Sequence, residues 1–400
     1  MLPGGSAILF SARSGAGRSG ISAVSLQNGE RREVIAPGNR PLYAPTGHLL
    51  YHSGLVNYAI PFDPVRLETS GASVPLTEVA GSFDVSATGT LAYTTRSTTI
   101  LRSGELVWVD RDGQQQLVTE GRRGYQPAPR IAPDGRRIAV TSAPEREIPV
   151  DIWTLDLDRD VFSRITISTG TDAAIRPVWS GDGSRIFFAS NRNGPFEIFA
   201  KSSDGTGEAT QVTFGALRFP TSISADGRLL FYTETGVDSD RNIGVLRLDV
   251  ESAPELIFDS KFNERLATLS PDGKWLAYVS DESGQLEVYV VSFPDLGQRQ
   301  QVSRNGGGEP LWAPNGLELF YRRSDSMMAV PVELGARFDA GAPVELFSGP
   351  FQRGSTNYDV SPDGLRFLMI RVPEDSGTED QIHLVLNWFE ELKRLVPTDN

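Results

Sequence analysis

The sequence predicts an all-β chain made of one repeated hairpin unit, and three observations support this prediction. A turn of the type small residue–Pro–Asp–Gly recurs nine times along the 400 residues, at intervals of 42 to 48 residues. A short apolar strand pattern follows each copy of the turn. A period of 3.6 residues, which would indicate amphipathic helices, is missing almost everywhere between the turns.

The turn motif explains why the chain reverses direction at each copy. Gly adopts positive φ without a Cβ clash, Asp accepts hydrogen bonds from its own backbone, and Pro presets the approach to the turn. Because these residues occupy the same place in every unit, we expect them to be structural. The six well-formed copies are centred on Asp134-Gly135, Asp182-Gly183, Asp226-Gly227, Asp272-Gly273, Asn315-Gly316 and Asp363-Gly364. The first three copies end at Gly5, Gly47 and Gly89 and have neither Asp nor Asn before the glycine.

Each unit holds four short strand segments. One strand leads into the turn, and a second leaves it. The third segment alternates and is rich in β-branched or aromatic residues, as at 151–157, 196–202 and 286–293, and a fourth short segment ends the unit. Four short antiparallel strands within about 45 residues are typical of one blade of a β-propeller. Trp153, Trp179, Trp275 and Trp312 hold repeat positions and are expected in the packing between blades.

The whole chain, residues 1–400, is therefore predicted to be one β-propeller repeat domain with nine repeat units. Units one to three cover about 1–119 and have degenerate turns, whereas units four to nine cover about 120–398. A single ring of about eight blades, in which both chain ends share a blade, leaves no strand edge exposed, and we favour it. A six-bladed ring plus a partial second ring is the alternative.

Two segments of thirteen residues, 106–118 and 384–396, are similar to each other. Both are predicted to form the outer two strands of a blade. For the second copy, a short amphipathic helix that starts at Trp388 is the alternative.

Composition excludes several kinds of chemistry. The chain has no Cys and three His, so disulfides, thiol catalysis and thiolate metal sites are excluded. Its net charge of −13 argues against a nucleic-acid partner, which requires a basic surface. It contains no Gly-x-Ser-x-Gly motif and no cluster of metal ligands. We therefore predict no catalytic residue, no cofactor and no bound metal.

Candidate ligand-binding residues precede the innermost strand of several units. Such positions face the mouth of the central channel of a propeller, where ligands and peptides dock. A solvated rim without a ligand is the alternative interpretation. Seven residues before the anchor glycines stand Arg40, Arg176, Glu309 and Asn357, and close to the same position stand Tyr125, Phe219, Glu264, Arg265 and Tyr358.

The N-terminal residues do not have the pattern of a signal peptide, because they lack a basic region followed by an apolar one. The sequence has no apolar run of the 18 residues that a membrane helix requires. We therefore expect no membrane segment in this chain, and these patterns alone leave its location unknown.

On these motifs the chain resembles the PD40 (WD40-like) repeats of TolB-like β-propellers. More narrowly, it resembles the C-terminal propeller region of bacterial, acidobacterial-type serine/threonine protein kinases. The segments that carry this resemblance are 43–76, 106–114, 262–294, 309–332, 358–371 and 386–398. In that family a kinase domain and a membrane helix precede a propeller outside the cytoplasmic membrane. The resemblance implies a sensor in an extracytoplasmic location if the chain is part of a membrane kinase, and a cytoplasmic location otherwise.

The chain departs from the kinase plan, since it has no glycine-rich kinase loop, no His-Arg-Asp and no Asp-Phe-Gly. No kinase activity is therefore expected. We predict a non-catalytic sensor or protein-interaction module whose ligand is a protein, a peptide or a glycan. The alternative is a propeller hydrolase or lyase that acts on a glycan or peptide at the channel mouth through Arg176, Glu264 and Glu309.

Overall fold

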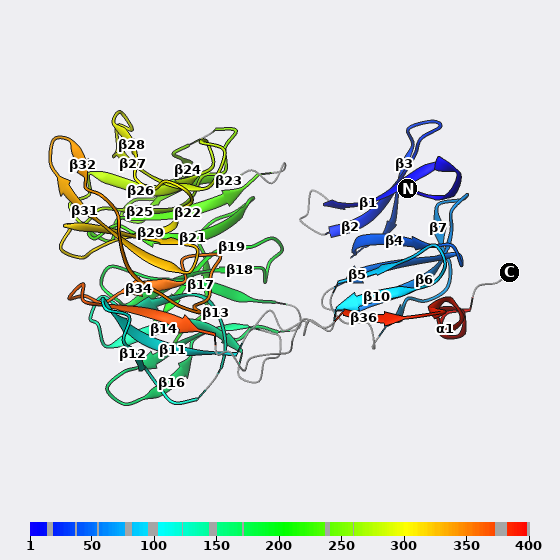
Figure 1. The fold of residues 1–400 in the computed structure, drawn as a ribbon, viewed down its shortest axis with the longest axis horizontal. Helices are drawn as coiled ribbons and strands as arrows, with labels where there is room; N and C mark the ends of the chain where they lie inside the picture. The colour runs from blue at the N-terminus through cyan, green and yellow to red at the C-terminus, as the bar shows by residue number, and fades with distance from the viewer. Residues whose placement is uncertain are drawn as a thin grey trace. The chain divides into compact units, whose positions relative to one another are not determined.

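The computed structural model describes residues 1–13, 19–36, 38–53, 56–76, 82–94, 103–121, 123–143, 150–169, 172–236, 241–258, 260–372 and 382–397. The chain forms two compact units (Figure 1). Unit 1 consists of Met1–Ile100 and Gly377–Asn400, and unit 2 consists of Leu101–Ser376. The chain therefore leaves unit 1, builds unit 2 and returns to unit 1.

The described part of unit 2 contains six groups of strands, which we call the first to the sixth sheet; the sixth and the first are joined by strand pairing into one eight-stranded sheet. The first two contain β13 (Arg123–Ile131), β14 (Arg137–Ala143), β15 (Asp151–Asp156) and β16 (Val161–Arg164), then β17 (Ala174–Trp179), β18 (Arg185–Ser190), β19 (Glu197–Ser202) and β20 (Thr210–Gln211). The third and fourth contain β21 (Leu217–Ile223), β22 (Leu229–Thr235), β23 (Arg241–Arg247) and β24 (Glu255–Leu256), then β25 (Arg265–Leu269), β26 (Trp275–Ser280), β27 (Glu287–Ser292) and β28 (Arg299–Gln301). The fifth contains β29 (Gly308–Trp312), β30 (Glu318–Arg323), β31 (Ser326–Leu334), β32 (Phe338–Ala340) and β33 (Val344–Ser348).

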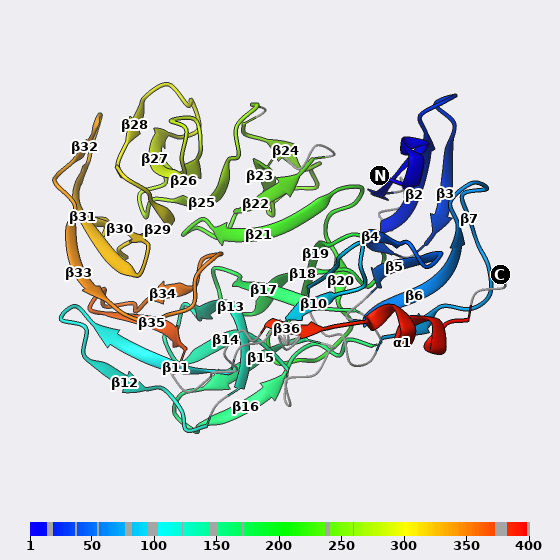
Figure 2. The ribbon, with the colours of Figure 1, turned by 45° about the vertical axis from the view of Figure 1, so that its right-hand side comes forward.

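The sixth sheet closes unit 2, because both ends of the unit contribute to it. It contains β34 (Tyr358–Val360), β35 (Arg366–Arg371), β11 (Ser103–Asp110) and β12 (Gln115–Leu117). β11 pairs with β35 from Glu105↔Arg371 to Asp110↔Arg366. Phe320 and Phe347 of the fifth sheet pack with Phe367 of the sixth, while β34 contacts β13 of the first. Figure 2 shows the short outer strands β12, β16, β24 and β28 around the rim of unit 2, and β13, β21 and β34 toward its middle.

Buried side chains between neighbouring sheets form the core of unit 2. Trp275, Trp312 and Phe338 belong to the cluster between the fourth and fifth sheets. The indole Nε1–H of Trp312 donates to the Thr268 carbonyl at 3.1 Å, and that of Trp179 donates to the Arg130 carbonyl at 3.1 Å. Trp179 and Trp312 thus pack neighbouring sheets and also bond them, whereas the Nε1 of Trp275 is buried without a hydrogen-bond partner in the described structure.

Unit 1 contains three sheets among its described strands. They are β1 (Ala7–Arg13), β2 (Ser19–Ser25) and β3 (Arg31–Ile35); β4 (Asn39–Ala44), β5 (His48–Ser53), β6 (Val56–Asp63), β7 (Glu68–Thr69) and β8 (Val74–Pro75); and β9 (Phe83–Val85), β10 (Leu91–Thr94) and β36 (Ile382–Val385). A 3-10 turn, η1 (Pro3–Gly5), precedes β1. Helix α1 (Trp388–Leu395) follows β36 and buries Trp388 and Leu392 against Leu50 and Leu91.

The all-β prediction is confirmed, but the arrangement of the blades differs from the single ring of about eight that we favoured. The described strands form six groups in unit 2, two of which join into one eight-stranded sheet, and three sheets in unit 1, which resembles the alternative. The physical reason is the pairing of β11 with β35, which closes the chain between residues 103 and 371 on itself. As a consequence, residues 103–119, which we assigned to the first three sequence repeats, lie in the compact unit 2.

The two similar segments adopt different structures. Residues 106–118 contain β11 and β12, the outer two strands of the sixth sheet, as predicted. Residues 384–396 contain the end of β36 and then α1, so here the helix that we considered as the alternative is present. Among the described residues, no helix has the length and apolar character that crossing a membrane requires.

Candidate ligand site at the inner strands of unit 2

The inner strands of unit 2 share a backbone irregularity at the position seven residues before the anchor glycine. Strand register shifts there in the first five sheets. Ala128, Arg176, Leu266 and Glu309 adopt positive φ at this position, with values of 79°, 57°, 57° and 57°. Few non-glycine residues adopt this conformation, and a bulge of this kind redirects a side chain. The strands thus bend at the point where the sequence placed candidate ligand residues.

A small recess of about 10 Å³ lies where these bulges meet. Its size is that of one water molecule or one carboxylate oxygen. Its walls come from the first four sheets and from the segment before β34. The residues that line it are Ala128, Arg130, Arg176, Pro177, Pro220, Thr221, Leu266, Ser355 and Thr356.

Arg176 is the main charged group at this recess. Its guanidinium carbon lies 4.3 Å from the centroid of the Phe219 ring, within cation–π distance. Among the described residues, this guanidinium has neither an ion pair nor a hydrogen bond. Burial, together with the positive charges of Arg241, Arg265 and Arg130, lowers the pKa of Arg176 to about 10. The side chain is therefore still charged at neutral pH.

Two further arginines contribute positive charge to Arg176. Arg265 is half-buried at the start of β25, and its Nε is buried without a hydrogen-bond partner in the described structure. Burial and the charge of Arg241 lower the pKa of Arg265. Arg241 is exposed at the start of β23, and its carbonyl accepts a hydrogen bond from the Glu264 backbone at 2.7 Å. We call Arg176, Arg241 and Arg265 the arginine mouth.

Two carboxylates of the inner strands, Glu309 on β29 and Asp359 on β34, are engaged by backbone and amide groups. Glu309 accepts hydrogen bonds from the backbone N–H groups of Gly354 and Asn357 at 3.2 and 2.8 Å, and from Asn357 Nδ2 at 3.2 Å. Asp359 accepts from the Ile131 N–H at 2.7 Å. Burial raises the pKa of both carboxyl groups. They therefore hold the inner strands together, because most of their acceptor capacity faces the protein.

The structure separates the nine predicted candidates into three groups. Arg176, Phe219 and Arg265 lie at or beside the recess. Glu264, Glu309, Asn357, Tyr358 and Tyr125 are buried, with exposed fractions between 0 and 7 %. Arg40 lies in unit 1, where it also has positive φ and its side chain donates to Ser82 Oγ at 3.3 Å.

Two charged residues near the recess were not predicted. Arg130 is buried two residues after the first bulge and donates to the carbonyls of Thr356 and Tyr358. Its spacing from the anchor Gly135 is a sequence signal that we did not use. Arg241 belongs to a third strand, so no repeat position indicates that it lies near Arg176.

The aspartates of the turns have a local structural role. Asp182 Oδ1 accepts from Ser180 Oγ at 2.6 Å and from the Ser184 N–H at 3.0 Å. These hydrogen bonds lower the pKa of Asp182 to about 2. Equivalent bonds from a serine hydroxyl and a backbone N–H are accepted by Asp226, Asp272 and Asp363. Of these two bonds, Asp134 and Asn315 accept the one from the backbone. The glycine that follows has positive φ in all six turns, at Gly135, Gly183, Gly227, Gly273, Gly316 and Gly364.

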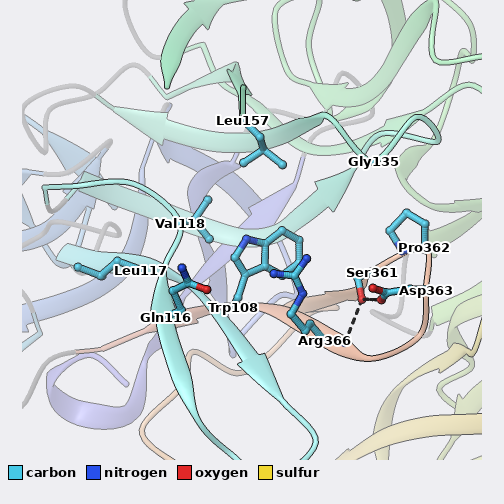
Figure 3. Close-up of a pocket in the computed structure, with 10 residues that line it drawn as sticks. All are labelled: Trp108, Gln116, Leu117, Val118, Gly135, Leu157, Ser361, Pro362, Asp363 and Arg366. Carbon is cyan, nitrogen blue, oxygen red and sulfur yellow. Dashed lines mark hydrogen bonds between the residues drawn. The ribbon is translucent and has the colours of Figure 1, made fainter. Parts of the chain in front are cut away.

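A second and larger pocket, of about 390 Å³, lies on the turn side of unit 2 between the sixth and first sheets (Figure 3). The guanidinium carbon of Arg366 lies 4.8 Å from the centroid of the Trp108 ring. Ser361 Oγ donates to Asp363 and accepts from the Arg366 N–H at 2.9 Å. The polar groups labelled at Ser361 and Asp363 thus already bond within the turn, and none of the predicted ligand residues lies here.

Comparison with known proteins shows which family of β-propellers this chain is similar to. The family model described as TolB beta propeller domain matches residues 86–315, more than half of the chain. The Tol-Pal system protein TolB of Wolinella succinogenes is 26% identical over 183 residues, which are 45% of this chain and 42% of that protein. The protein of the same name from Anaeromyxobacter dehalogenans strain 2CP-C is 33% identical over 103 residues, 26% of this chain and 23% of that protein.

These matches span less than half the length of either relative. Among solved structures, the putative TolB from Agrobacterium tumefaciens aligns with a TM-score of 0.53 and 18% identity, over 67% of this chain and 98% of that one. This likeness concerns the fold alone. From the matched repeats and this shared fold it follows that the chain belongs to the TolB β-propeller domain family.

Proposed function

We propose that the chain is a non-catalytic propeller module that binds a protein or peptide ligand at the inner strands of unit 2. The observation that supports this function is Arg176, a half-buried guanidinium at the recess that has no partner among the described residues. An uncompensated charge of this kind is costly to desolvate, whereas a ligand that pairs with it removes the cost. The neighbouring carboxylates Glu309 and Asp359 are occupied by backbone N–H groups.

Selection of a random peptide library displayed on phage, with the whole chain immobilised, tests this function. We expect a recurring set of peptides, and we expect bound peptide to slow amide hydrogen exchange in 172–177, 217–222 and 260–266. Failure to enrich any peptide contradicts the proposal. Protection confined to the pocket beside Trp108 contradicts the location of the site.

We further propose that the module is the sensory region of a receptor-type serine/threonine kinase and works outside the cytoplasmic membrane. The resemblance of residues 262–294 and 386–398 to that kinase family supports this role. Sequencing the DNA upstream of the Met1 codon tests it, because a membrane helix and a kinase domain are expected in the same reading frame. A promoter and ribosome-binding site directly before Met1 would contradict the receptor role.

A hydrolase or lyase is the second candidate, because burial raises the pKa of Glu264 and of Glu309, as a general acid requires. Both side chains are engaged, Glu264 by Ser260 Oγ at 3.0 Å and Glu309 by Asn357, and their exposed fractions are 2 and 7 %. A panel of peptides and polysaccharides incubated with the chain is expected to remain intact. Turnover that is lost in folded Glu264→Gln and Glu309→Gln variants would establish the enzyme instead.

A further inference from the structure

The arginine mouth indicates the chemical class of the ligand. We propose that Arg176, Arg241 and Arg265 bind the carboxylate groups of an acidic peptide segment, with Phe219 as the apolar platform beside them. This inference rests on the proposed binding function and specifies its ligand. The turn motif does not require an arginine at any of these three positions, and no buried carboxylate among the described residues forms an ion pair with them.

The arginines of the mouth come from three neighbouring sheets. Arg176 lies on β17 of the second sheet, Arg241 begins β23 of the third, and Arg265 begins β25 of the fourth. The hydrogen bond from the Glu264 N–H to the Arg241 carbonyl joins the third and fourth sheets directly beside Arg265. The three arginines of the mouth thus belong to strands of neighbouring sheets, and Arg176 among them lines the recess.

These arginines differ from others in unit 2 that are paired with carboxylates. Arg218 pairs with Glu234 at 2.7 Å, and Arg299 pairs with Glu282 at 2.7 Å. In a chain with 51 acidic against 38 basic residues, carboxylates are in excess. Nevertheless, no described carboxylate forms an ion pair with a side chain of the arginine mouth, although the charges of Glu309 and Asp281 partly offset the lowering of the pKa of Arg265. Since a half-buried cation without a partner is unfavourable, the missing anion is best supplied by a ligand.

A carboxylate fits this place better than a nucleic acid does. The recess admits an object of about one oxygen atom. A planar carboxylate can accept two parallel hydrogen bonds from one guanidinium, so it would bind across the mouth with one oxygen directed inward. A long polyanion would be repelled by the net charge of −13. The half-buried Phe219 offers apolar surface to the chain that carries the carboxylate, and the buried Pro177 and Pro220 line the recess.

Isothermal titration calorimetry with the whole chain tests the proposal. The probe is hexaglutamate, acetylated at its N-terminus and amidated at its C-terminus, and the control peptide is hexaglutamine with the same ends. We expect hexaglutamate to bind and hexaglutamine not to bind. Raising the salt concentration from 50 to 300 mM is expected to weaken the binding, because the contact is electrostatic.

Matched variants locate the binding. Arg176→Gln and Arg265→Gln are each expected to weaken hexaglutamate binding about tenfold, which corresponds to the loss of one charge-assisted hydrogen bond. Arg241→Gln is expected to weaken it about threefold, because this side chain is exposed and screened. Arg247→Gln is the control, since Arg247 ends the same strand β23, is exposed and pairs with Asp249 at 3.5 Å. It should bind as the unmodified chain does.

Equal binding of hexaglutamine, or equal loss in Arg176→Gln and Arg247→Gln, would overturn the proposal. If Arg176→Gln does not fold, Arg176→Lys and the exposed Arg241→Gln keep the test decisive, since both remove hydrogen-bond donors at the mouth. A neutral peptide with a free C-terminus, compared with its amidated form, shows whether a terminal or a side-chain carboxylate is recognised.

The failure of this inference is distinguishable from the failure of the proposed function. If the selected peptides are neutral, protect the inner strands and bind Arg176→Gln normally, the module binds peptides but not through carboxylates. If no peptide of any kind binds, the proposed function itself fails.

Discussion

Units 1 and 2 are built from the same repeat, yet they complete their last sheet in different ways. In unit 2 the sixth sheet combines β34 and β35 with β11 and β12, so strands from both ends of the unit pair with each other. In unit 1 the returning chain adds the strand β36 to β10, and helix α1 then covers the apolar cluster that contains Leu50 and Leu91. The repeat therefore determines the blade, whereas the strand pairing at the ends determines how many blades belong together.

The two units also differ in the hydrogen bonds that stabilise their turns. In unit 2 an Asp or Asn receives hydrogen bonds in each turn, as Asp182 does from Ser180 and Ser184. In unit 1 the turn before β5 has Thr46, whose hydroxyl lies 2.9 Å from His48 Nδ1. His48 Nε2 lies 2.7 Å from the Val396 carbonyl. At this turn of unit 1, side chains thus connect the turn to the C-terminal segment, whereas the turns of unit 2 have bonds within the turn.

The largest expected effect concerns α1. Trp388 is 5 % exposed, and Trp388→Ala removes the largest side chain that the helix places in the core of unit 1. We expect a loss of about 3 to 5 kcal/mol in the stability of unit 1. Hydrogen exchange should accelerate in β5 and β10 and remain unchanged in β18 and β26. Leu386→Ala is the control, because Leu386 is 72 % exposed, and equal effects of the two substitutions would contradict this role of α1.

A pair of glycine substitutions separates backbone strain from contact with α1. Gly89 and Gly273 have φ of +86° and +75°, so Ala at either position costs about 1 kcal/mol through its backbone. At Gly273 an added Cβ meets no atom within 4 Å, whereas at Gly89 it comes within 2.8 Å of the Phe389 ring. We expect Gly89→Ala to cost about 1 to 3 kcal/mol more than Gly273→Ala, measured by chemical denaturation.

The double variant Gly89→Ala/Phe389→Ala is the control for this contact. It should lose less stability than the sum of its two single variants, because removal of the ring relieves the overlap. Additive losses would show that Phe389 does not press on the turn at Gly89.

His48 makes the stability of unit 1 depend on pH. Its exposed fraction is 0 %, and burial lowers its pKa below the ordinary value of 6.5. The unfolded chain therefore binds the proton more readily, and stability falls as the pH drops below about 6.5, by up to about 1.4 kcal/mol per pH unit until the folded pKa is reached. Exchange rates in β5 and β10 at pH 5 and pH 8 measure this dependence.

A His48→Gln variant should lose stability at pH 8 but show a weaker dependence on pH. His52→Gln, on the same strand, should keep the dependence of the unmodified chain. If His48→Gln and His52→Gln respond to pH alike, the burial of His48 is not the cause.

The parts of this fold that were predictable from the sequence are local. An Asp-Gly turn between two apolar strands depends on a few adjacent residues, so the hairpins of unit 2 were predicted with their positions. The pairing of β11 with β35 joins residues about 260 apart, and no local pattern distinguishes it from the pairing of consecutive blades. The same is true of the candidate site, where Arg241 approaches Arg176 only because the third and second sheets are neighbours.

The sequence left two alternatives for residues 384–396, a pair of strands or the helix α1, and the structure shows which physical differences favour the helix. Residues 106–118 contain Asp110 and Gly113, which make a turn between two strands, whereas 384–396 have Trp388 and Glu391 at the corresponding places. Glu390 pairs with Lys393, and Glu391 pairs with Arg394, with the acidic residues in the first turn and the basic ones in the last. These pairs favour a helix. The charge order was thus the signal that distinguishes the two copies.

The smallest expected effect concerns the turn Ser86-Ala87-Thr88-Gly89 of unit 1. There the Thr90 N–H donates to Ser86 Oγ at 2.9 Å, and Ser86 Oγ lies 3.0 Å from Thr88 Oγ1. A Thr88→Asp substitution supplies the carboxylate that the turns of unit 2 have, and this carboxylate can accept from the Ser86 hydroxyl and, in place of Ser86 Oγ, from the Thr90 N–H. We expect it to stabilise unit 1 by about 0.5 to 1 kcal/mol at pH 7, measured by chemical denaturation.

The pH dependence of this gain identifies its cause. Hydrogen bonds lower the pKa of Asp182 from 3.8 to about 2 in the equivalent turn, so the carboxylate stabilises the folded state above about pH 4 and loses this effect as the pH falls toward 2. Thr88→Asn is the control, because Asn315 Oδ1 accepts the Leu317 N–H at 3.0 Å in unit 2 without a charge. Thr88→Asn should keep part of the gain at every pH. A gain in Thr88→Asp that persists at pH 2 would show that charge is not what distinguishes the turns of the two units.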